Sequence, residues 1–405
     1  MKNIEIVKNY LKSGETTNEN FKLGMEVEHF IIKEDTLESV DYYEENGIRD
    51  LLKELKKSSH WEEIFEQNNI IGLKRNGSTI TLEPGAQVEI SVRPFEKIED
   101  IEREYVSILK EIKRCINKRK QDIAIVGYHP KSKIKDIPFI PKERYSFMKE
   151  YFKDKGKYAL NMMKGTASTQ ISIDYESEFD FSRKFRVANF LSPLIYCIFD
   201  NSPVFEGEQW KGNSLRIDIW DNCDNDRSGI VKGALGEEFN YESYARYILE
   251  RPPIITKRKD EYIFTKDMSV KEVFSDSEMN SDEIEHILTM FFPDVRAKNY
   301  IEIRMADALP YPYNLSYAAF IKGIFYGENS LNWLYEESLK YTEDDLNTFK
   351  KEVVSFGMDS VIYNENAYDF MEKLLKMCES ELGDEGKYLY PIYDIIHKKL
   401  KVWNV

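Results

Sequence analysis

A five-residue segment in the last third of the chain alternates apolar and charged side chains. In Ile301-Glu302-Ile303-Arg304-Met305 every second residue is apolar. Successive side chains of a β-strand point to opposite faces, so an extended backbone here would place Glu302 and Arg304 together on one face. The pattern therefore favours a strand with one buried face and one polar face.

Four other segments repeat this alternation in distant parts of the chain. They are residues 23–30, 79–90, 169–174 and 214–220. In the second, Pro84-Gly85 interrupts the strand, which resumes with Gln87 and Glu89 on one face. Strands of parallel sheets read as continuous apolar runs, so five half-polar strands predict an antiparallel sheet. We expect an α+β fold, with an open polar sheet face forming an active-site funnel and helices on the other side.

The predicted polar face would carry a group of carboxylates, namely Glu26, Glu28, Glu83, Glu89 and Glu302. Two like charges about 4 Å apart repel by ~1 kcal/mol in water and ~4 kcal/mol at an effective dielectric constant near 20. Such a group needs counterions, and carboxylate-rich sites suit Mg²⁺ or Mn²⁺. Arg216 and Arg304 would share the face, where a guanidinium can bind a carboxylate or phosphate bidentately.

A series of motifs follows in order between residues 24 and 310, namely GMEVEHF, ITLEPGAQVEIS, IPFIPKERYSFM, MMKGTASTQISIDY, KFRVANFLSPLIYCIFDNSPVFEG, SLRIDIWDNCDNDRSGIV and FFPDVRAKNYIEIRMADALP. Together they resemble the plant-type glutamate-cysteine ligase family, which also has bacterial members. The resemblance implies a fold similar to the catalytic domain of glutamine synthetase. It also implies ATP- and Mg²⁺-dependent joining of the γ-carboxylate of L-glutamate to the amine of L-cysteine.

The resemblance assigns roles to individual residues. It implies metal ligation by Glu26, Glu28, Glu83, Glu89, Gln170 and Glu302. It implies that Arg216 binds glutamate and that Arg304 faces the transferred phosphoryl group. Further substrate contacts are implied for Met163, Thr166, Thr169, Trp220 and Arg227.

The residue types suit this chemistry. An amine cannot attack a carboxylate directly, so ATP must first convert it to an acyl phosphate, whose charge metal ions and arginines neutralise. The sequence has no Walker loop and no G-x-G-x-x-G fingerprint. Two alternatives stay open: the same chemistry with another amine acceptor, and a catalytically silent binding or regulatory relative.

The composition limits the partners. The chain has 405 residues and a formal net charge of −15, with acidic residues spread along its length, so nucleic acid is an unfavourable partner. No segment is apolar enough to predict a membrane span or a signal peptide. Four cysteines without C-x-x-C spacing predict reduced thiols. We expect a cytoplasmic monomer or homodimer that binds small molecules.

We expect one catalytic domain over residues 1–405, with a sheet-bearing core over residues 1–310 and a helical part over residues 311–405. Apolar periodicity predicts helices within residues 1–20 and after residue 142, and over residues 48–65, 98–118, 179–199, 315–334, 344–356, 367–382 and 390–400. His29 lies on the apolar side of its predicted strand, which favours a structural role.

Overall fold

A nine-stranded antiparallel sheet forms the centre of the computed structural model, which describes residues 2–258 and 261–404. The strand order is β14-β15-β7-β1-β5-β4-β3-β2, and β6 pairs with the end of β1. The strands are β1 (Leu23–Lys33), β2 (Glu62–Glu66), β3 (Asn69–Arg75), β4 (Ser78–Leu82), β5 (Val88–Phe95), β6 (Gln121–Ala124), β7 (Thr169–Ile173), β14 (Val295–Ala297) and β15 (Ile301–Ile303). This confirms the α+β class and the antiparallel sheet.

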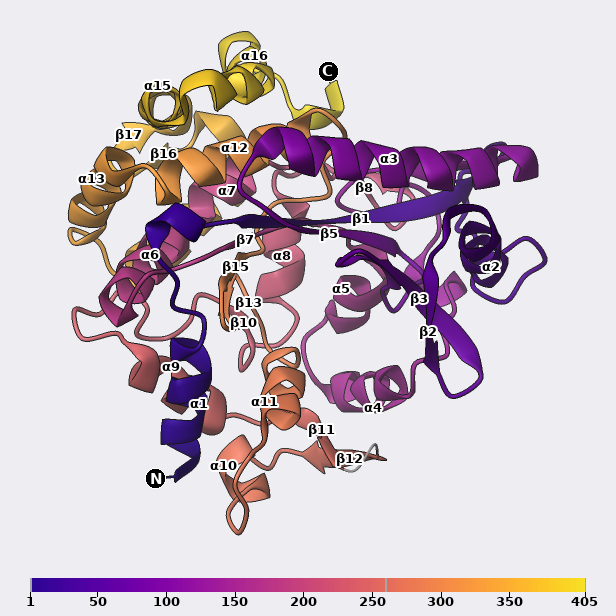
Figure 1. Cartoon of the computed structure of the whole chain (residues 1–405). Coiled ribbons are helices and arrows are strands. Elements are labelled where there is room, and N and C mark those ends of the chain that lie inside the picture. Colours follow the sequence, from indigo (N-terminus) through magenta and orange to yellow (C-terminus); the bar gives the residue numbers. More distant parts are fainter. Residues whose placement is uncertain (1, 259–260, 405) are drawn as a thin grey trace.

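Two helices cover the apolar face of the sheet. α3 (Ile98–Ile116) packs on β5, and α12 (Tyr313–Phe325) packs on β1 and β7, as Figure 1 shows above the sheet. The covered side chains are fully buried and include Met25, Val27, Val88, Ile90, Ile171, Ile173, Ile301 and Ile303. At ~25 cal/mol per Å² of apolar surface, this layer is the main force that fixes the strand register.

The opposite face is enclosed by segments from the middle of the chain, with α5 and α8 lying below the sheet in Figure 1. The predicted open face is therefore covered by these segments. The helices on this side are α4 (Glu143–Tyr151), α5 (Ala159–Gly165), α8 (Leu215–Asp221), α9 (Tyr241–Leu249), α10 (Val270–Val273) and α11 (Ser281–Leu288). Short strands accompany them: β8 (Val204–Phe205), β9 (Glu208–Gln209), β10 (Ser228–Gly229), β11 (Ile254–Arg258), β12 (Glu261–Lys266) and β13 (Phe292–Pro293).

One predicted strand is wrong. Residues 214–220 form the N-cap and all but the last residue of helix α8 (Leu215–Asp221) rather than a strand. Leu215, Arg216 and Ile217 are all buried, so the segment is covered on more than one side. The alternation of apolar and charged residues therefore does not mark one buried and one polar face of a strand. Arg216 therefore enters the site from a helix outside the sheet.

Several predicted boundaries also differ. Residues 48–65 form α2 (Ile48–Ser59) and then strand β2, and residues 79–90 form two paired strands joined by a turn at Pro84-Gly85. Residues 179–199 divide into α6 (Glu178–Phe190) and α7 (Ser192–Ile198), because Pro193 lacks an amide hydrogen and favours the first turn of a new helix.

The part of the chain after residue 310 is mainly helical, as expected. Residues 315–334 fall in α12 and α13 (Glu328–Ser338), followed by α14 (Glu343–Phe356), α15 (Ala367–Leu382) and α16 (Tyr390–Lys398), with a short β16 (Val361–Ile362) and β17 (Glu365–Asn366) pair. The first helix of the chain is α1 (Lys2–Lys12). Among the described residues, no helix has the length and apolarity to cross a membrane. The single catalytic domain stays a prediction.

Candidate active site

Strand register brings the predicted polar residues onto one face. Glu28 of β1 lies directly opposite Glu89 of β5, and Glu26 lies opposite Gln170 of β7. Glu302 of β15 lies opposite Ser172 of β7. Paired residues in antiparallel strands share a face, so segments about 280 residues apart in sequence meet over the central strands.

The acidic half of this face consists of Glu26, Glu28, Glu83 and Glu89. Glu28 is 9% exposed, and its two oxygens accept hydrogen bonds from the Ser168 amide (3.0 Å), the Ser168 hydroxyl (2.9 Å) and Gln170 Nε2 (3.2 Å). Glu89 accepts from the Thr81 hydroxyl at 2.7 Å. Within the described residues, none of these four carboxylates forms an ion pair.

Burial and repulsion from neighbouring carboxylates disfavour the charged forms of Glu26, Glu28 and Glu89. Burial, together with the Glu83 and Glu89 carboxylates, raises the pKa of Glu28 to about 8. Burial, together with Glu26 and Glu83, raises the pKa of Glu89 to about 8. Burial and Glu302 raise the pKa of Glu26 to about 7. Nearby cations oppose these shifts, namely Arg216 at Glu28, Lys142 at Glu89, and Arg296, Lys298 and Arg304 at Glu26, but the raising effects are larger.

The basic half of the face surrounds Glu302, which is fully buried. Arg296 Nη2 lies 2.6 Å and Arg304 Nη1 lies 2.9 Å from Glu302 Oε2, and Lys298 Nζ lies 3.6 Å from Oε1. Despite burial, these cations hold the pKa of Glu302 well below its usual range. Three cations around one carboxylate leave an excess of positive charge, which suits an anionic ligand.

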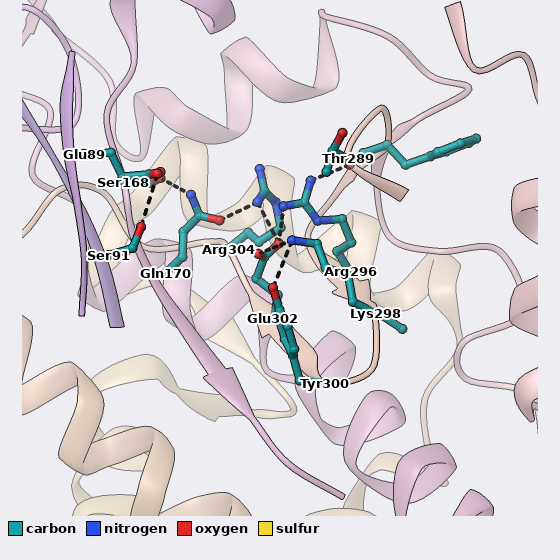
Figure 2. A network of polar contacts seen from close by, with 12 residues as sticks. Glu89, Ser91, Ser168, Gln170, Thr289, Arg296, Lys298, Tyr300, Glu302 and Arg304 are labelled. Atoms are coloured by element: carbon teal, nitrogen blue, oxygen red, sulfur yellow. Dashed lines mark hydrogen bonds and ion pairs between the residues drawn. The ribbon is translucent and has the colours of Figure 1, made fainter. Parts of the chain in front are cut away.

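Gln170 joins the two halves. Its Nε2 donates to Glu28, and its Oε1 accepts a hydrogen bond from Arg304 Nη1. Figure 2 shows Gln170 between Glu89 and Ser168 on one side and the Glu302 cluster on the other. The face is thus divided into neighbouring regions of opposite charge.

Arg216 lies in α8 beside the basic half. Its Nη2 donates to the backbone carbonyl of Arg304 at 3.1 Å, and its guanidinium lies 5.2 Å from the centre of the Trp220 ring. The residue is 4% exposed, yet its Nε and Nη1 have no hydrogen-bond partner. Buried unpaired donors are costly, so Arg216 is arranged to bind an oxygen-bearing ligand.

A tight turn links β4 to β5 and contacts the α5 segment. A side chain at Gly85 would place its Cβ 2.7 Å from the Lys164 carbonyl, so the turn requires glycine there. Gln87 Nε2 donates to the carbonyls of Met163 (3.3 Å) and Thr166 (2.9 Å). The sheet thereby fixes the backbone of the α5 segment.

Several predicted contact residues have internal partners. The Thr166 hydroxyl donates to the Met162 carbonyl at 2.7 Å, and the Thr169 hydroxyl accepts from the Leu309 amide at 2.9 Å. Arg227 is fully buried, pairs with Asp224 and donates to the Pro252 carbonyl at 2.6 Å. In contrast, the buried indole nitrogen of Trp220 has no partner. The substrate roles of these residues stay predictions.

The sequence argument missed three cations at the face. Arg296 of β14 and Lys298, which follows that strand, contact Glu302, and Lys142 Nζ donates to the Leu82 carbonyl at 2.7 Å. Burial and Arg144 lower the pKa of Lys142 to about 8, while Glu83 and Glu89 act in the opposite direction. Arg296 and Lys298 lie two residues apart, the same spacing as Glu302 and Arg304, so strand alternation could have found them.

The side chains differ in how well they fit a divalent cation. Glu28, Glu83 and Glu89 influence one another electrostatically and form no ion pair within the described residues, and carboxylate oxygens are the donors that Mg²⁺ or Mn²⁺ prefers. Glu302 and Gln170 instead contact Arg304. Over residues 2–258 and 261–404, no three His, Cys, Asp or Glu side chains are disposed as a ready metal cluster. Metal ligation by the six predicted residues stays a prediction.

The chain is similar to curated glutamate–cysteine ligases of plants. The chain is 33% identical over 384 residues to glutamate–cysteine ligase B of Oryza sativa subsp. japonica, a match that covers 93% of this chain and 77% of the relative. It is 31% identical over 384 residues to the Arabidopsis thaliana glutamate–cysteine ligase, covering 93% and 73%. Both relatives are described as chloroplastic.

The fold also matches a solved structure. That structure is a glutamate–cysteine ligase from Francisella tularensis in complex with AMP, with a TM-score of 0.55, 12% identity, and coverage of 94% of this chain and 82% of the other. At this identity the match supports the fold alone. Residues 22–397 match the glutamate-cysteine ligase family 2 (GCS2), and the chain, a ligase, belongs to that family.

Proposed function

We propose that this chain uses ATP to join the γ-carboxylate of L-glutamate to the amine of L-cysteine, with release of ADP and phosphate. The proposal rests on family membership and on one observation, the division of a buried face into an acidic half and a basic half. The AMP complex of the Francisella relative supports a nucleotide as co-substrate.

The division matches the needs of acyl-phosphate chemistry. The γ-carboxylate attacks the terminal phosphorus of ATP, the bond from that phosphorus to the bridging oxygen breaks, and ADP leaves. The amine then attacks the acyl carbon and phosphate leaves, while the amine proton passes to a base. In-line phosphoryl transfer needs positioning and positive charge far more than a protein nucleophile.

The residues described above would supply these functions. Arg216, with two unpaired donors, would hold a substrate carboxylate. Arg304, supported by Arg296 and Lys298, would face the transferred phosphoryl group. Glu28, Glu83 and Glu89 would hold Mg²⁺, which when bound supplies the charge that lets a polyphosphate lie beside carboxylates.

The test is an ADP-release assay with ATP and glutamate against a panel of amines, with the mass of the product measured. We expect release that depends on both glutamate and cysteine and a γ-glutamylcysteine product. Preference for another amine would keep the chemistry and change the acceptor. Glutamate-independent ATP hydrolysis as the only activity would contradict the proposal.

Glu28→Gln is the matching variant because it removes one charge with little change in shape. We expect it to lower kcat at least ~100-fold, on the scale of one lost preorganised electrostatic group. The control is Glu62→Gln on strand β2, where the side chain is 74% exposed. Equal activity of the two variants at saturating Mg²⁺ would remove Glu28 from the site.

A further inference from the structure

One charged side chain from beyond α16 reaches the interior near the site. Lys401 Nζ lies 2.9 Å from Oδ2 of Asp200, and the exposed fractions of the two side chains are 18% and 1%. Lys401 is remote from the sheet in sequence and contacts none of the predicted site residues. Its effect on the site passes through Asp200.

Asp200 fixes the beginning of α8. Its Oδ2 accepts a hydrogen bond from the Ser214 amide at 2.8 Å, and the Ser214 hydroxyl donates to the Tyr196 carbonyl at 3.0 Å. Ser214 has φ 45°, a left-handed conformation that the surrounding contacts must hold in place. Arg216 follows two residues later.

A second buried carboxylate lies beside the first. Asp307 is 1% exposed, and its Oδ2 accepts from the Asn201 amide (2.8 Å) and the Ser202 hydroxyl (2.7 Å). Its Oδ1 has no hydrogen-bond partner. Burial and the Asp200 carboxylate raise the pKa of Asp307 to about 7, whereas the Arg216 guanidinium opposes this shift.

Two buried acids thus interact with two cations, Lys401 at Asp200 and Arg216 near Asp307. Removal of Lys401 would leave Arg216 as the cation that balances both acids. The Arg216 guanidinium, which already acts electrostatically on Asp307, would then be drawn toward these acids at the expense of an incoming anion.

We propose that Lys401 is a positioning residue for the glutamate site, because its neutralisation of Asp200 keeps the Arg216 guanidinium available to a substrate carboxylate. This inference rests on the proposed ligase function. It makes the segment after α16 part of the machinery that sets substrate affinity, although this segment does not touch the substrate.

Steady-state kinetics with glutamate and ATP varied separately test the inference. K401M should raise the KM for glutamate about tenfold, the scale of one lost charge-assisted contact, and change kcat and the KM for ATP less than ~2-fold. D200N should restore the KM in the K401M background, because it removes the unbalanced charge and its amide oxygen still accepts from Ser214. K398M is the control, since Lys398 is 59% exposed and pairs with an exposed Asp394.

The other outcomes are equally decisive. An unchanged glutamate KM in K401M, or a loss that D200N does not rescue, overturns the positioning role. A parental chain that forms no γ-glutamyl product overturns the proposed function and this inference together. K401Q replaces K401M if the latter does not fold, and the same rise in KM is expected because the charge is again lost.

Discussion

The two arginines at the site differ in what surrounds them. Arg304 contacts Glu302 and Gln170, lies among other cations and has one unpaired donor, Nε. Arg216 has two unpaired donors, Nε and Nη1, and its contacts within the described residues are with a backbone carbonyl and an aromatic ring. A guanidinium with free donors suits a group that binds in the ground state. A guanidinium among other cations suits the transferred phosphoryl group, whose charge distribution changes during the reaction.

Arg216→Ala and Arg304→Ala should therefore affect different kinetic constants. Arg216→Ala is expected to raise mainly the KM for glutamate, and Arg304→Ala to lower mainly kcat, each by ~100-fold on the scale of one preorganised group. Lysine at either position should rescue only partly, because it offers a point charge rather than a fork. The measurement is steady-state kinetics, with Arg103→Ala as control because Arg103 is 69% exposed on α3. If Arg216→Ala lowered only kcat and Arg304→Ala raised only the KM for glutamate, the proposed positions of glutamate and the phosphoryl group would be wrong.

At the scale of elements, alternation predicted the strands that carry Glu26, Glu28, Glu89, Gln170 and Glu302, because their apolar positions meet one continuous helix layer. It misplaced Arg216, since a segment buried on both sides by tertiary contacts can show the same alternation in a helix. The pairing of Glu302 with Arg296 depends on register between strands, which periodicity within one segment does not specify. Cytoplasmic location and oligomeric state stay predictions.

His29 shows how β1 is joined to the helix layer. Its Nδ1 lies 3.0 Å from the Val88 carbonyl and its Nε2 lies 2.9 Å from the Tyr105 hydroxyl, and it is 1% exposed. A carbonyl can only accept, so Nδ1 donates to Val88 and Nε2 accepts from Tyr105. This neutral, buried arrangement agrees with the predicted structural role.

Stability should consequently depend on His29 below neutral pH. Burial lowers the pKa of His29 from 6.5 to about 4, so between these values the unfolded state binds a proton that the folded state does not. Neutral His29 therefore contributes about 3 kcal/mol to the free energy of unfolding. This contribution is fully present above pH 6.5 and is lost as the pH falls toward 4. Urea unfolding should be measured at several pH values between 4 and 7. The free energy of unfolding should change less steeply with pH for His29→Gln than for the parental chain. Identical slopes would show that His29 is protonated in the fold.

At the scale of the whole molecule, the acidic half of the face lowers the stability of the fold, because its carboxylates are buried close to one another. The four carboxylates come from β1, β5 and the turn after β4, and no ion pair within the described residues neutralises them. The raised pKa values of Glu26, Glu28 and Glu89 express this cost. A bound divalent cation would offset it.

Catalysis should accordingly stop in excess EDTA and return with added Mg²⁺ or Mn²⁺. The physical reason is that ATP and this face are both anionic, and only a cation can bring them together. Circular dichroism in EDTA serves as the control, because it shows that the chain remains folded. Full turnover in excess EDTA would contradict the metal site.

The order of strands in the sheet has a consequence for synthesis on the ribosome. β1, β4 and β5, which carry the acidic half, all lie within the first 95 residues, whereas the basic half comes from β14, β15 and Arg304 after residue 294. Pairings between residues far apart in sequence have high contact order and form slowly. A nascent chain can therefore gather its carboxylates long before their arginine neighbours have been translated, and the edge of β1 that receives β7 stays unpaired until residues 169–173 have emerged.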